Sequence, residues 1–356
     1  GIPIRLHYSW FIIFGLITWS LSSYYFPEAA PDLSIPSYWI KGVLASILLF
    51  ASVAFHELAH SYVALKHRVG IQSVTLFIFG GVAQMKGEPP NPKAEFQIAL
   101  AGPLSSFFLS GIFLLAALMT SPETGALFSY LARINLILGL FNLIPGFPMD
   151  GGRLLRSALW KRRNDYVAAT QKASTVGKVV GILFILSGLF SFFMGFPGAL
   201  WFLLIGWVAF SAAQSSYLQA SLQDALQGIR VGDVMVKSPD IVFLSPSMTV
   251  DQAVSDFFLR FGYGGFPVLE GDRLLGITSL KEIKNVPRER WPEVTVREVL
   301  VPHQKRWELS PEDEVLEALR RMLQEDQGRI VVTRNGRVIG LITRNGISRY
   351  IQLMSR

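Results

Sequence analysis

The chain contains the sequence His56-Glu57-Leu58-Ala59-His60, in which a glutamate lies between two histidines four residues apart. Residues at positions i and i+4 of a helix share one face, so both imidazoles can reach one metal ion. The glutamate can take a proton from a water molecule that attacks a substrate. This spacing predicts a metal site that performs hydrolysis.

The residues that precede this motif are apolar, and Val43–Phe55 contains no charged residue. Polar groups at the end of such a run are costly in hydrocarbon unless they face a protected site. Chance matches to the motif also occur in soluble helices, where two surface histidines are the ordinary interpretation. The apolar surroundings favour a metal site inside a membrane.

Composition divides the chain into two parts. Of its 356 residues 51% are hydrophobic and 17% are charged, and the apolar residues are concentrated before about residue 220. The chain has no cysteine, which excludes disulfides and thiolate ligands, so metal ligands must be His, Asp or Glu. The net charge is +7, but the basic residues cluster beside apolar runs, which indicates membrane orientation and no nucleic-acid partner.

Apolar runs predict a polytopic α-helical membrane protein with six transmembrane helices. A cleaved signal peptide is the alternative for the first run, but no small-residue cleavage pattern follows it, so we favour a retained span. Basic residues gather on the side of both termini, which predicts that the termini and the soluble part are cytosolic in the cell membrane of a prokaryote. The predicted spans are about 8–26, 38–65, 96–119, 131–147, 179–194 and 199–215.

The segment Gly70–Gly87 between the second and third spans has a different pattern. Ile71–Phe79 is rich in β-branched and aromatic residues, and Val82–Met85 follows a Gly-Gly pair. We expect a short β-hairpin or edge-strand insertion here. It is either a surface hairpin or an edge that accepts an extended substrate peptide as an added strand, with Val74, Leu76 and Ile78 as candidate substrate contacts.

The soluble part contains an internal repeat. Ser245–Val250 recurs at Ser310–Val315, and Phe266–Gly276 recurs at Ile330–Gly340. We expect a membrane domain over 1–217, a linker over 218–230 and two α/β domains over 231–290 and 291–356.

Each repeat predicts a hairpin, with its turn at Gly271-Asp272 or at Asn335-Gly336. The two repeats resemble a pair of CBS domains. Such pairs often bind adenine nucleotides through a Ser or Thr and an Asp three residues later. Here these positions hold Ser279 with Glu282, and Thr343 with Gly346, so neither repeat keeps the Asp. An adenine nucleotide and a dimerisation or docking role both remain open, the latter implying a homodimer or higher oligomer.

Two histidines leave zinc short of the three protein ligands that catalytic sites usually provide. Asp150 is the strongest candidate for the third. It follows Pro145 and Pro148, which interrupt the fourth span, and it precedes Gly151-Gly152, which permit close approach of the backbone. The alternative is that Asp150 is the N-cap of a basic helix that begins near Arg153.

Three segments in this order resemble the site-2 protease family of intramembrane zinc metalloproteases, in particular its prokaryotic branch with six spans and C-terminal CBS domains. They are His56–His60, Gly102-Pro103 in the third span and Asn142–Arg153. The family often has Gly-Pro-x-x-Asn in the third span, and this chain has Ser106 at the last position.

The resemblance implies hydrolysis of peptide bonds within or beside a membrane. His56, His60 and Asp150 would hold one Zn²⁺, Glu57 would be the general base, and Asn142 would orient substrate or its oxyanion. The implied substrates are single-span membrane proteins such as anti-sigma or pro-sigma factors, or remnant signal peptides. A CBS-gated transporter or channel and a catalytically silent scaffold are the alternatives, and both leave Glu57 without a role.

Overall fold

The computed structural model describes residues 2–78, 80–196, 198–237, 241–271, 273–302, 308–324, 327–334 and 337–354. The chain forms two compact units, Gly1–Ala220 and Ser221–Arg356. The first unit contains the apolar part of the sequence, and the second contains the internal repeat.

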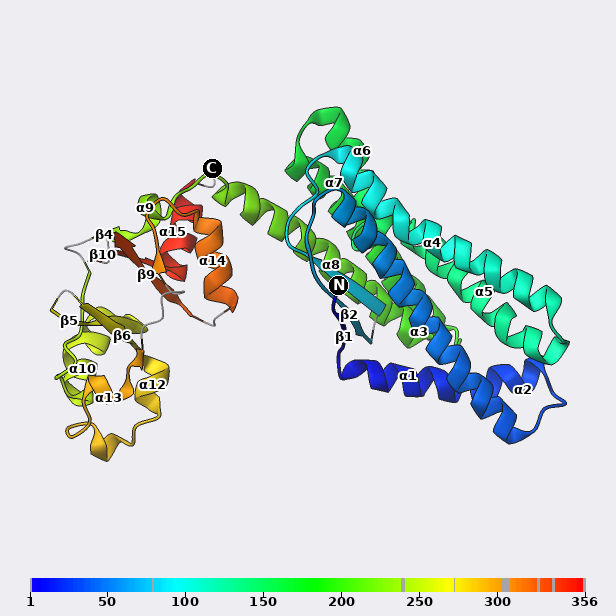
Figure 1. Cartoon of the computed structure of the whole chain (residues 1–356), viewed down its shortest axis with the longest axis horizontal. Helices are drawn as coiled ribbons and strands as arrows, with labels where there is room; N and C mark the ends of the chain where they lie inside the picture. Colours follow the sequence, from blue (N-terminus) through cyan, green and yellow to red (C-terminus); the bar gives the residue numbers. More distant parts are fainter. Residues whose placement is uncertain are drawn as a thin grey trace. The chain divides into compact units, whose positions relative to one another are not determined.

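The first unit consists of long helices with a small sheet packed against them (Figure 1). Its helical segments are α1 (Ser9–Ser20), a π-helix (Leu21–Tyr25), α2 (Phe26–Ala29), α3 (Ile35–Lys66), α4 (Pro92–Met119), α5 (Pro122–Asn142), α6 (Asp150–Arg163), α7 (Tyr166–Phe193) and most of α8 (Ala199–Leu226), whose last residues belong to the second unit.

Five of these helices, α3, α4, α5, α7 and α8, are long and apolar enough to cross a membrane. They match the second to sixth predicted spans. The predicted first span over 8–26 is divided among α1, the π-helix and α2, so in the described part of the chain no sixth helix reaches the required length.

Capping residues, more than hydropathy, decide where the helices begin. The Asn91 side chain accepts a hydrogen bond of 2.9 Å from the Ala94 backbone N–H at the start of α4, and Asp165 caps α7 in the same way. Helix α5 begins at Pro122, nine residues before the apolar run that predicted it. Apolar runs therefore mark the core of each span but not its ends.

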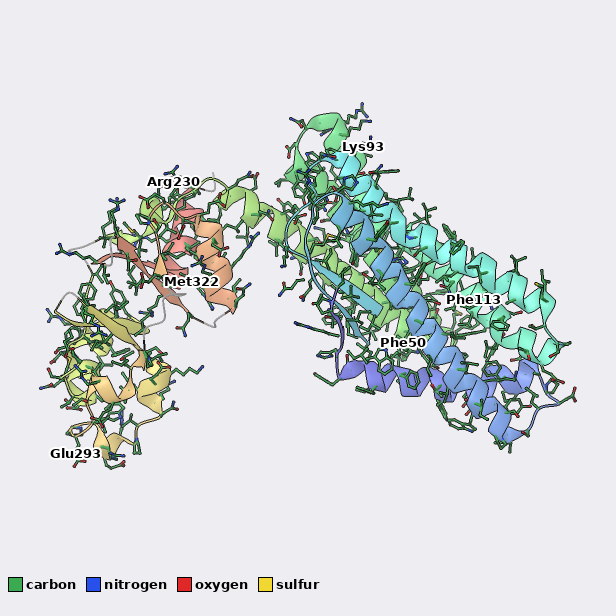
Figure 2. The ribbon with its side chains drawn as sticks, viewed as in Figure 1. Phe50, Lys93, Phe113, Arg230, Glu293 and Met322 are labelled. Atoms are coloured by element: carbon green, nitrogen blue, oxygen red, sulfur yellow. The ribbon has the colours of Figure 1, made fainter. Side chains whose placement is uncertain are left out.

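Helices α3, α4 and α5 pack closely in the first unit. Phe107 of α4 lies against Gly139 of α5, where an added Cβ would meet the Phe107 ring at 2.5 Å. Figure 2 shows Lys93 at one end of α4 and Phe113 nearer the other. One buried apolar cluster joins the segment after α1 to α3 and α5 through Leu21, Phe26, Tyr38, Ala45, Leu127 and Leu131.

The small sheet has the strand order β1-β2-β3 and consists of β1 (Ile4–Leu6), β2 (Ile71–Phe77) and β3 (Gly80–Met85). Strands β2 and β3 form the predicted antiparallel hairpin, while Phe79 lies outside the described residues. Strand β1 pairs with β2 in parallel, with Ile4 opposite Val74 and Leu6 opposite Leu76. Three residues before an apolar run carry no strand signal of their own, so this third strand was not predicted.

The second unit contains many short elements. Its helical segments are α9 (Val231–Val234), α10 (Val250–Ala253), a π-helix (Val254–Phe258), α11 (Leu259–Phe261), α12 (Leu280–Lys284), a 3₁₀-helix (Arg288–Arg290), α13 (Val296–Val299), α14 (Val315–Gln324) and α15 (Arg344–Met354). Its strands are β4 (Val236–Lys237), β5 (Gly265–Glu270), β6 (Arg273–Ser279), β7 (Val301–Pro302), β8 (Glu308–Leu309), β9 (Arg329–Arg334) and β10 (Arg337–Thr343).

The two repeats of this unit exchange strands. Strand β4 of the first repeat pairs with β10 of the second, and β7 of the second repeat pairs with β6 of the first. The predicted hairpins are β5–β6 and β9–β10, although Asp272, Asn335 and Gly336 of their turns lie outside the described residues. The unit has two buried cores, one around Phe266 and one around Met322, and Figure 2 labels Met322. Val231 of the first repeat lies in the Met322 core, and Val296 of the second lies in the Phe266 core.

Candidate metal centre

Three side chains from two helices converge on one point. The Nε2 atoms of His56 and His60 are 3.2 Å apart, and they lie 3.2 and 3.1 Å from Oδ2 of Asp150. Zinc bonds of about 2.0–2.1 Å in tetrahedral geometry put ligand atoms roughly 3.3 Å apart. The three donors therefore fit a single zinc ion, and within the described part of the chain they are the only such group of three.

Helix α4 orients both histidines. The Nδ1 of His60 is 2.6 Å from the backbone carbonyl oxygen of Ile98, which can only accept a hydrogen bond. The Nδ1 of His56 is 2.9 Å from Oγ of Ser106. A proton on each Nδ1 leaves each Nε2 free to bind a metal, which is the usual arrangement of metal-binding histidines. The sequence showed Ser106 only as a departure from the Asn that the family often has there, and it gave no sign of this contact with His56.

Gly102 of α4 lies directly against the two imidazoles. A Cβ at this position would meet Nε2 of both His56 and His60. The Gly-Pro pair of the third span therefore has a steric role at the metal centre, because only glycine lets α4 approach the histidines this closely.

Asp150 begins α6, and Met149 holds the N-cap position in its place. The Asp150 carboxylate is directed toward the histidines, so the N-cap alternative is wrong. Glycines bring its segment close to its neighbours, since a Cβ on Gly151 would meet the backbone oxygens of Leu143 and Ile144. Burial raises the pKa of the Asp150 carboxyl, but the adjacent His60 and His56 outweigh this effect and hold that pKa well below its usual range.

Glu57 lies on α3 between the two histidines and faces strand β3. The backbone N–H of Ala83 lies close to its carboxylate. A Cβ on Gly81 would meet the Glu57 side chain at 2.5 Å, so the strand packs directly on this residue. The general base predicted from the sequence therefore lies between the metal donors and the outer edge of the sheet.

Comparisons with known proteins agree with this geometry. The model of peptidase family M50 matches residues 44–124 and 121–188, and the CBS domain model matches 231–289 and 296–353. Rip3 of Mycobacterium tuberculosis is 34% identical over 99% of this chain and 91% of its own length. The zinc metalloprotease MJ0392 of Methanocaldococcus jannaschii is 33% identical over 99% of this chain and 94% of its own.

This chain belongs to the M50, or site-2 protease, family. A solved structure of a site-2 protease from Methanocaldococcus jannaschii is also similar, at 36% identity over 61% of this chain and 91% of that chain, with a TM-score of 0.45. The chain is thus a multi-pass membrane metalloprotease of the M50 family with a C-terminal CBS pair.

The weaker site residues predicted for this M50 peptidase lie outside the two helices that carry the metal donors. Asn142 is the last residue of α5, and its half-buried side chain forms no hydrogen bond to the residues that the structure describes. Val74 and Leu76 lie in the central strand β2, where the Val74 N–H donates to Pro3 and the Leu76 carbonyl accepts from His7. The Ile78 N–H donates to Oγ of Ser9 at 3.2 Å.

The strand edge that faces Glu57 therefore belongs to β3 and not to β2. Strand β2 is paired on both sides, with β1 and with β3. Substrate contact by Val74, Leu76 and Ile78 stays a prediction, and a peptide that joins the sheet beside Glu57 has to pair with β3.

In the CBS pair of this M50 peptidase, the residues at the nucleotide positions cap helices. Ser279 and Glu282 form a capping box at the start of α12, in which the Ser279 backbone N–H donates to the Glu282 carboxylate at 2.9 Å. The Thr343 hydroxyl accepts from the Gly346 N–H at 3.0 Å at the start of α15. Thr343 also lines a cavity of about 360 Å³ together with Arg329 and Arg344. Nucleotide binding through these residues stays a prediction.

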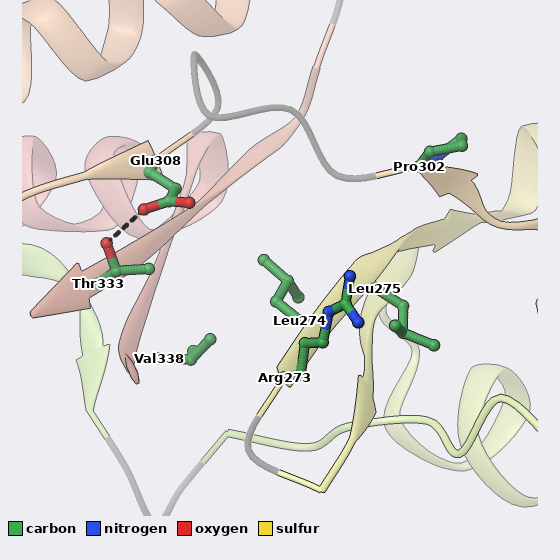
Figure 3. A pocket seen from close by; sticks show the side chains of 7 residues that line it. All are labelled: Arg273, Leu274, Leu275, Pro302, Glu308, Thr333 and Val338. Carbon is green, nitrogen blue, oxygen red and sulfur yellow. Dashed lines mark hydrogen bonds between the residues drawn. The ribbon is translucent and has the colours of Figure 1, made fainter. Parts of the chain in front are cut away.

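A second cavity of the CBS pair lies between the two repeats (Figure 3). Its lining consists of Arg273, Leu274 and Leu275 of the first hairpin and of Pro302, Glu308, Thr333 and Val338 of the second repeat. The Thr333 hydroxyl donates to the Glu308 carboxylate at 2.8 Å. None of the predicted nucleotide residues lines this cavity.

Proposed function

We propose that the chain is an intramembrane zinc endopeptidase that cleaves single-span membrane proteins within or beside their transmembrane segments. The observation that carries this proposal is the triangle of three donor atoms with Glu57 beside it. Both the donor set and the distances suit one zinc ion per chain.

The residues of the site divide the reaction between them. When bound, zinc polarises a carbonyl group and makes a water molecule more acidic. Glu57 accepts the proton of the attacking water and delivers it to the nitrogen of the departing amine, so one carboxylate acts first as base and then as acid. Gly81 of β3 packs against the Glu57 side chain, which keeps the carboxylate beside the strand on which substrate would lie. The Asn142 side chain, free of hydrogen bonds to the described residues, is available to orient the substrate carbonyl.

Strand β3 provides a means of holding the substrate. A transmembrane helix hides its peptide bonds in internal hydrogen bonds and has to unwind before it can be cut. The outer edge of β3 faces Glu57, and an unwound segment that pairs with it recovers backbone hydrogen bonds. Such pairing also aligns the segment with the catalytic side chains.

We further propose that the predicted first span, over 8–26, is a sixth crossing formed by α1, the π-helix and the start of α2. The apolar and aromatic residues of this segment are largely exposed, as expected for contact with lipid, and examples are Phe11, Ile12 and Trp19. With six crossings and the basic residues on the side of the termini, both termini and the CBS pair are cytosolic. The CBS pair would then regulate cleavage from the cytosol of a prokaryote, and it would also join subunits.

The substrates proposed here are membrane-tethered regulators, such as anti-sigma or pro-sigma factors, and remnant signal peptides. The family supports this substrate class, and a strand-pairing site of this kind depends little on side-chain identity because it binds main-chain atoms. The CBS pair would be the place where a cytosolic signal, for example an adenine nucleotide, changes the rate.

The deciding experiment compares the unmodified chain with Glu57→Gln in detergent or liposomes. Bound zinc and cleavage of a model single-span substrate are measured for both. We expect zinc in both and cleavage only in the unmodified chain, because Gln keeps the shape of Glu57 but cannot accept the proton. Cleavage by Glu57→Gln at the normal rate would contradict its role as base, and absence of zinc from the unmodified chain would contradict the metal centre itself.

A further inference from the structure

The metal centre is assembled from two parts of the fold that are not joined locally. Helix α4 fixes the orientation of the two histidine rings through contacts with Ile98, Gly102 and Ser106. Helix α6 carries Asp150. The position of Asp150 relative to the histidines therefore depends on whatever fixes α6 against α4.

A buried ion pair connects these two helices. Glu95 of α4 is fully buried, and its Oε1 accepts a hydrogen bond of 2.7 Å from Nε of Arg156 and a second one from a terminal nitrogen of the same guanidinium. Glu95 lies one turn before Ile98, which holds His60, and Arg156 lies less than two turns after Asp150. The pair thus joins the two ligand-bearing parts close to the ligands.

The Arg156 guanidinium also contacts the segment that leads into Asp150. It lies 4.9 Å from the ring centre of Phe147, which is three residues before Asp150, and 4.6 Å from that of Tyr166 at the start of α7. The Tyr166 hydroxyl donates to Glu88 at 2.7 Å, in the segment between β3 and α4. The guanidinium also donates to the Thr170 hydroxyl at 3.5 Å and lies 4.0 Å from the Glu88 carboxylate. A planar guanidinium with this many contacts has little freedom to move.

Stability alone is a weak reason for this arrangement. Burying two charges costs free energy that their attraction often fails to recover, and apolar side chains of similar size would commonly serve as well. The other oxygen of Glu95, Oε2, is buried without a hydrogen-bond partner among the described residues, which adds to this cost. Unlike apolar packing, the hydrogen bonds of an ion pair are directional, so they can fix the position of one helix relative to another.

We propose that the Glu95–Arg156 pair is a positioning device that fixes Asp150 at ligand distance from His56 and His60. Neither residue touches the metal or the substrate; both act through α4, α6 and the Phe147 segment. This inference rests on the proposed zinc site and adds the residues that hold its third ligand in place.

The test measures zinc retention and folding separately. Zinc release to a chelator, the thermal unfolding midpoint, and kcat and KM for a single-span substrate are determined for the full-length chain and for Arg156→Lys, Arg156→Gln, Glu95→Gln and the double variant Glu95→Gln/Arg156→Gln. Gly42→Ala is the control, because its added methyl would clash with Ser22 and Thr18 about 21 Å along α3 from His56.

If the pair positions Asp150, both single Gln variants lose zinc affinity by roughly 10–100-fold and lose kcat with little change in KM. Arg156→Lys recovers part of the affinity because it keeps the charge. The double variant recovers the unfolding midpoint, since no unpaired charge is left buried, but does not recover zinc affinity. Gly42→Ala lowers the midpoint while zinc affinity stays normal.

Two outcomes overturn the inference. One is normal zinc affinity in the Gln variants, and the other is zinc loss that follows the unfolding midpoint in every variant, Gly42→Ala included. In both cases the proposed function still stands if the unmodified chain binds zinc and cleaves the single-span substrate. An unmodified chain that binds no zinc overturns the proposed function as well.

Discussion

In the membrane unit, His56, His60 and Asp150 come from two helices and place three donor atoms within 3.2 Å of one another. In the CBS unit, Ser279 and Glu282 form hydrogen bonds with each other at the start of α12. Both groups of residues stand at positions that a family resemblance marks as functional. The first group converges on a common point, whereas the second is satisfied locally.

The difference has a simple physical cause. A Ser followed three residues later by Glu is also the pattern of a capping box, so the helix start itself supplies partners for both side chains. Two histidines one turn apart have no such local use for their Nε2 atoms. The Asp150 carboxylate, in the first turn of α6 behind Met149, does not cap its own helix and turns toward them. Polar residues at a motif position are stronger evidence of a site when their own helix leaves them unpartnered.

The largest effect should come from removing the carboxylate ligand. Asp150→Ala should reduce bound zinc to background and abolish cleavage, because two histidines alone hold zinc weakly. Metal content and cleavage of a single-span substrate are the measurements. Asp165→Ala is the matched control: it removes a carboxylate that only caps α7, costs about 1 kcal/mol and should leave zinc in place. Normal zinc content in Asp150→Ala would remove Asp150 from the ligand set.

A smaller loss is expected when the space beside the histidines is filled. Gly102→Ala puts a methyl group where the two Nε2 atoms lie, and a displacement of about 1 Å can cost roughly 100-fold in rate. Gly111→Ala on the same helix is the control, because nothing lies within 4 Å of its added Cβ. Equal rates for the two variants would show that α4 can move away from the histidines freely.

A still smaller effect on zinc binding is expected from the loss of the hydrogen bond to His56. Ser106→Ala should weaken zinc binding about 10-fold, since a residue that fixes the orientation of a ligand typically contributes this much. Zinc affinity is measured by competition with a chelator. Ser105→Ala is the neighbouring control, because the Ser105 hydroxyl donates only to the Gly102 carbonyl of its own helix. If both serine variants bind zinc equally well, the contact between Ser106 and His56 does not orient this ligand.

The smallest effect is expected in the CBS unit. Ser279→Ala should destabilise this unit by about 1 kcal/mol, the usual cost of losing a cap, while zinc content and cleavage stay normal. Chemical denaturation of the full chain, followed by a probe in the CBS unit, measures the cost. Ser255→Ala, which removes an exposed hydroxyl bonded to its own helix, should be nearly neutral.

The same variant tests whether the motif residues of the CBS unit serve only to cap a helix. If the unmodified chain binds adenosine monophosphate and Ser279→Ala removes this binding while stability stays unchanged, then Ser279 serves a ligand and not the helix cap. The two units would in that case both use their motif residues for binding.

The sequence by itself determined the features that depend on local pattern. The apolar runs gave five helices that can cross a membrane, the β-branched segment gave the β2–β3 hairpin, and the internal repeat gave the CBS pair. The His-Glu-x-x-His spacing predicted two ligands and a base, because one helical turn separates the two histidines. These signals are short-range, so each can be interpreted without knowing what packs against the segment.

Tertiary structure decided the features that join distant segments. His56 and Asp150 are 94 residues apart, and only the packing of α3, α4 and α6 brings them to 3.2 Å. The same packing gives Ser106 its contact with His56, makes Gly102 necessary, and pairs Glu95 with Arg156. Strand β1 occupies one side of β2 and so leaves β3 to present its edge to Glu57. The proline and glycine neighbours of Asp150 marked it as a candidate ligand, but the other contacts have no local signal in a single sequence, because each depends on how side chains from separate elements fill the same space.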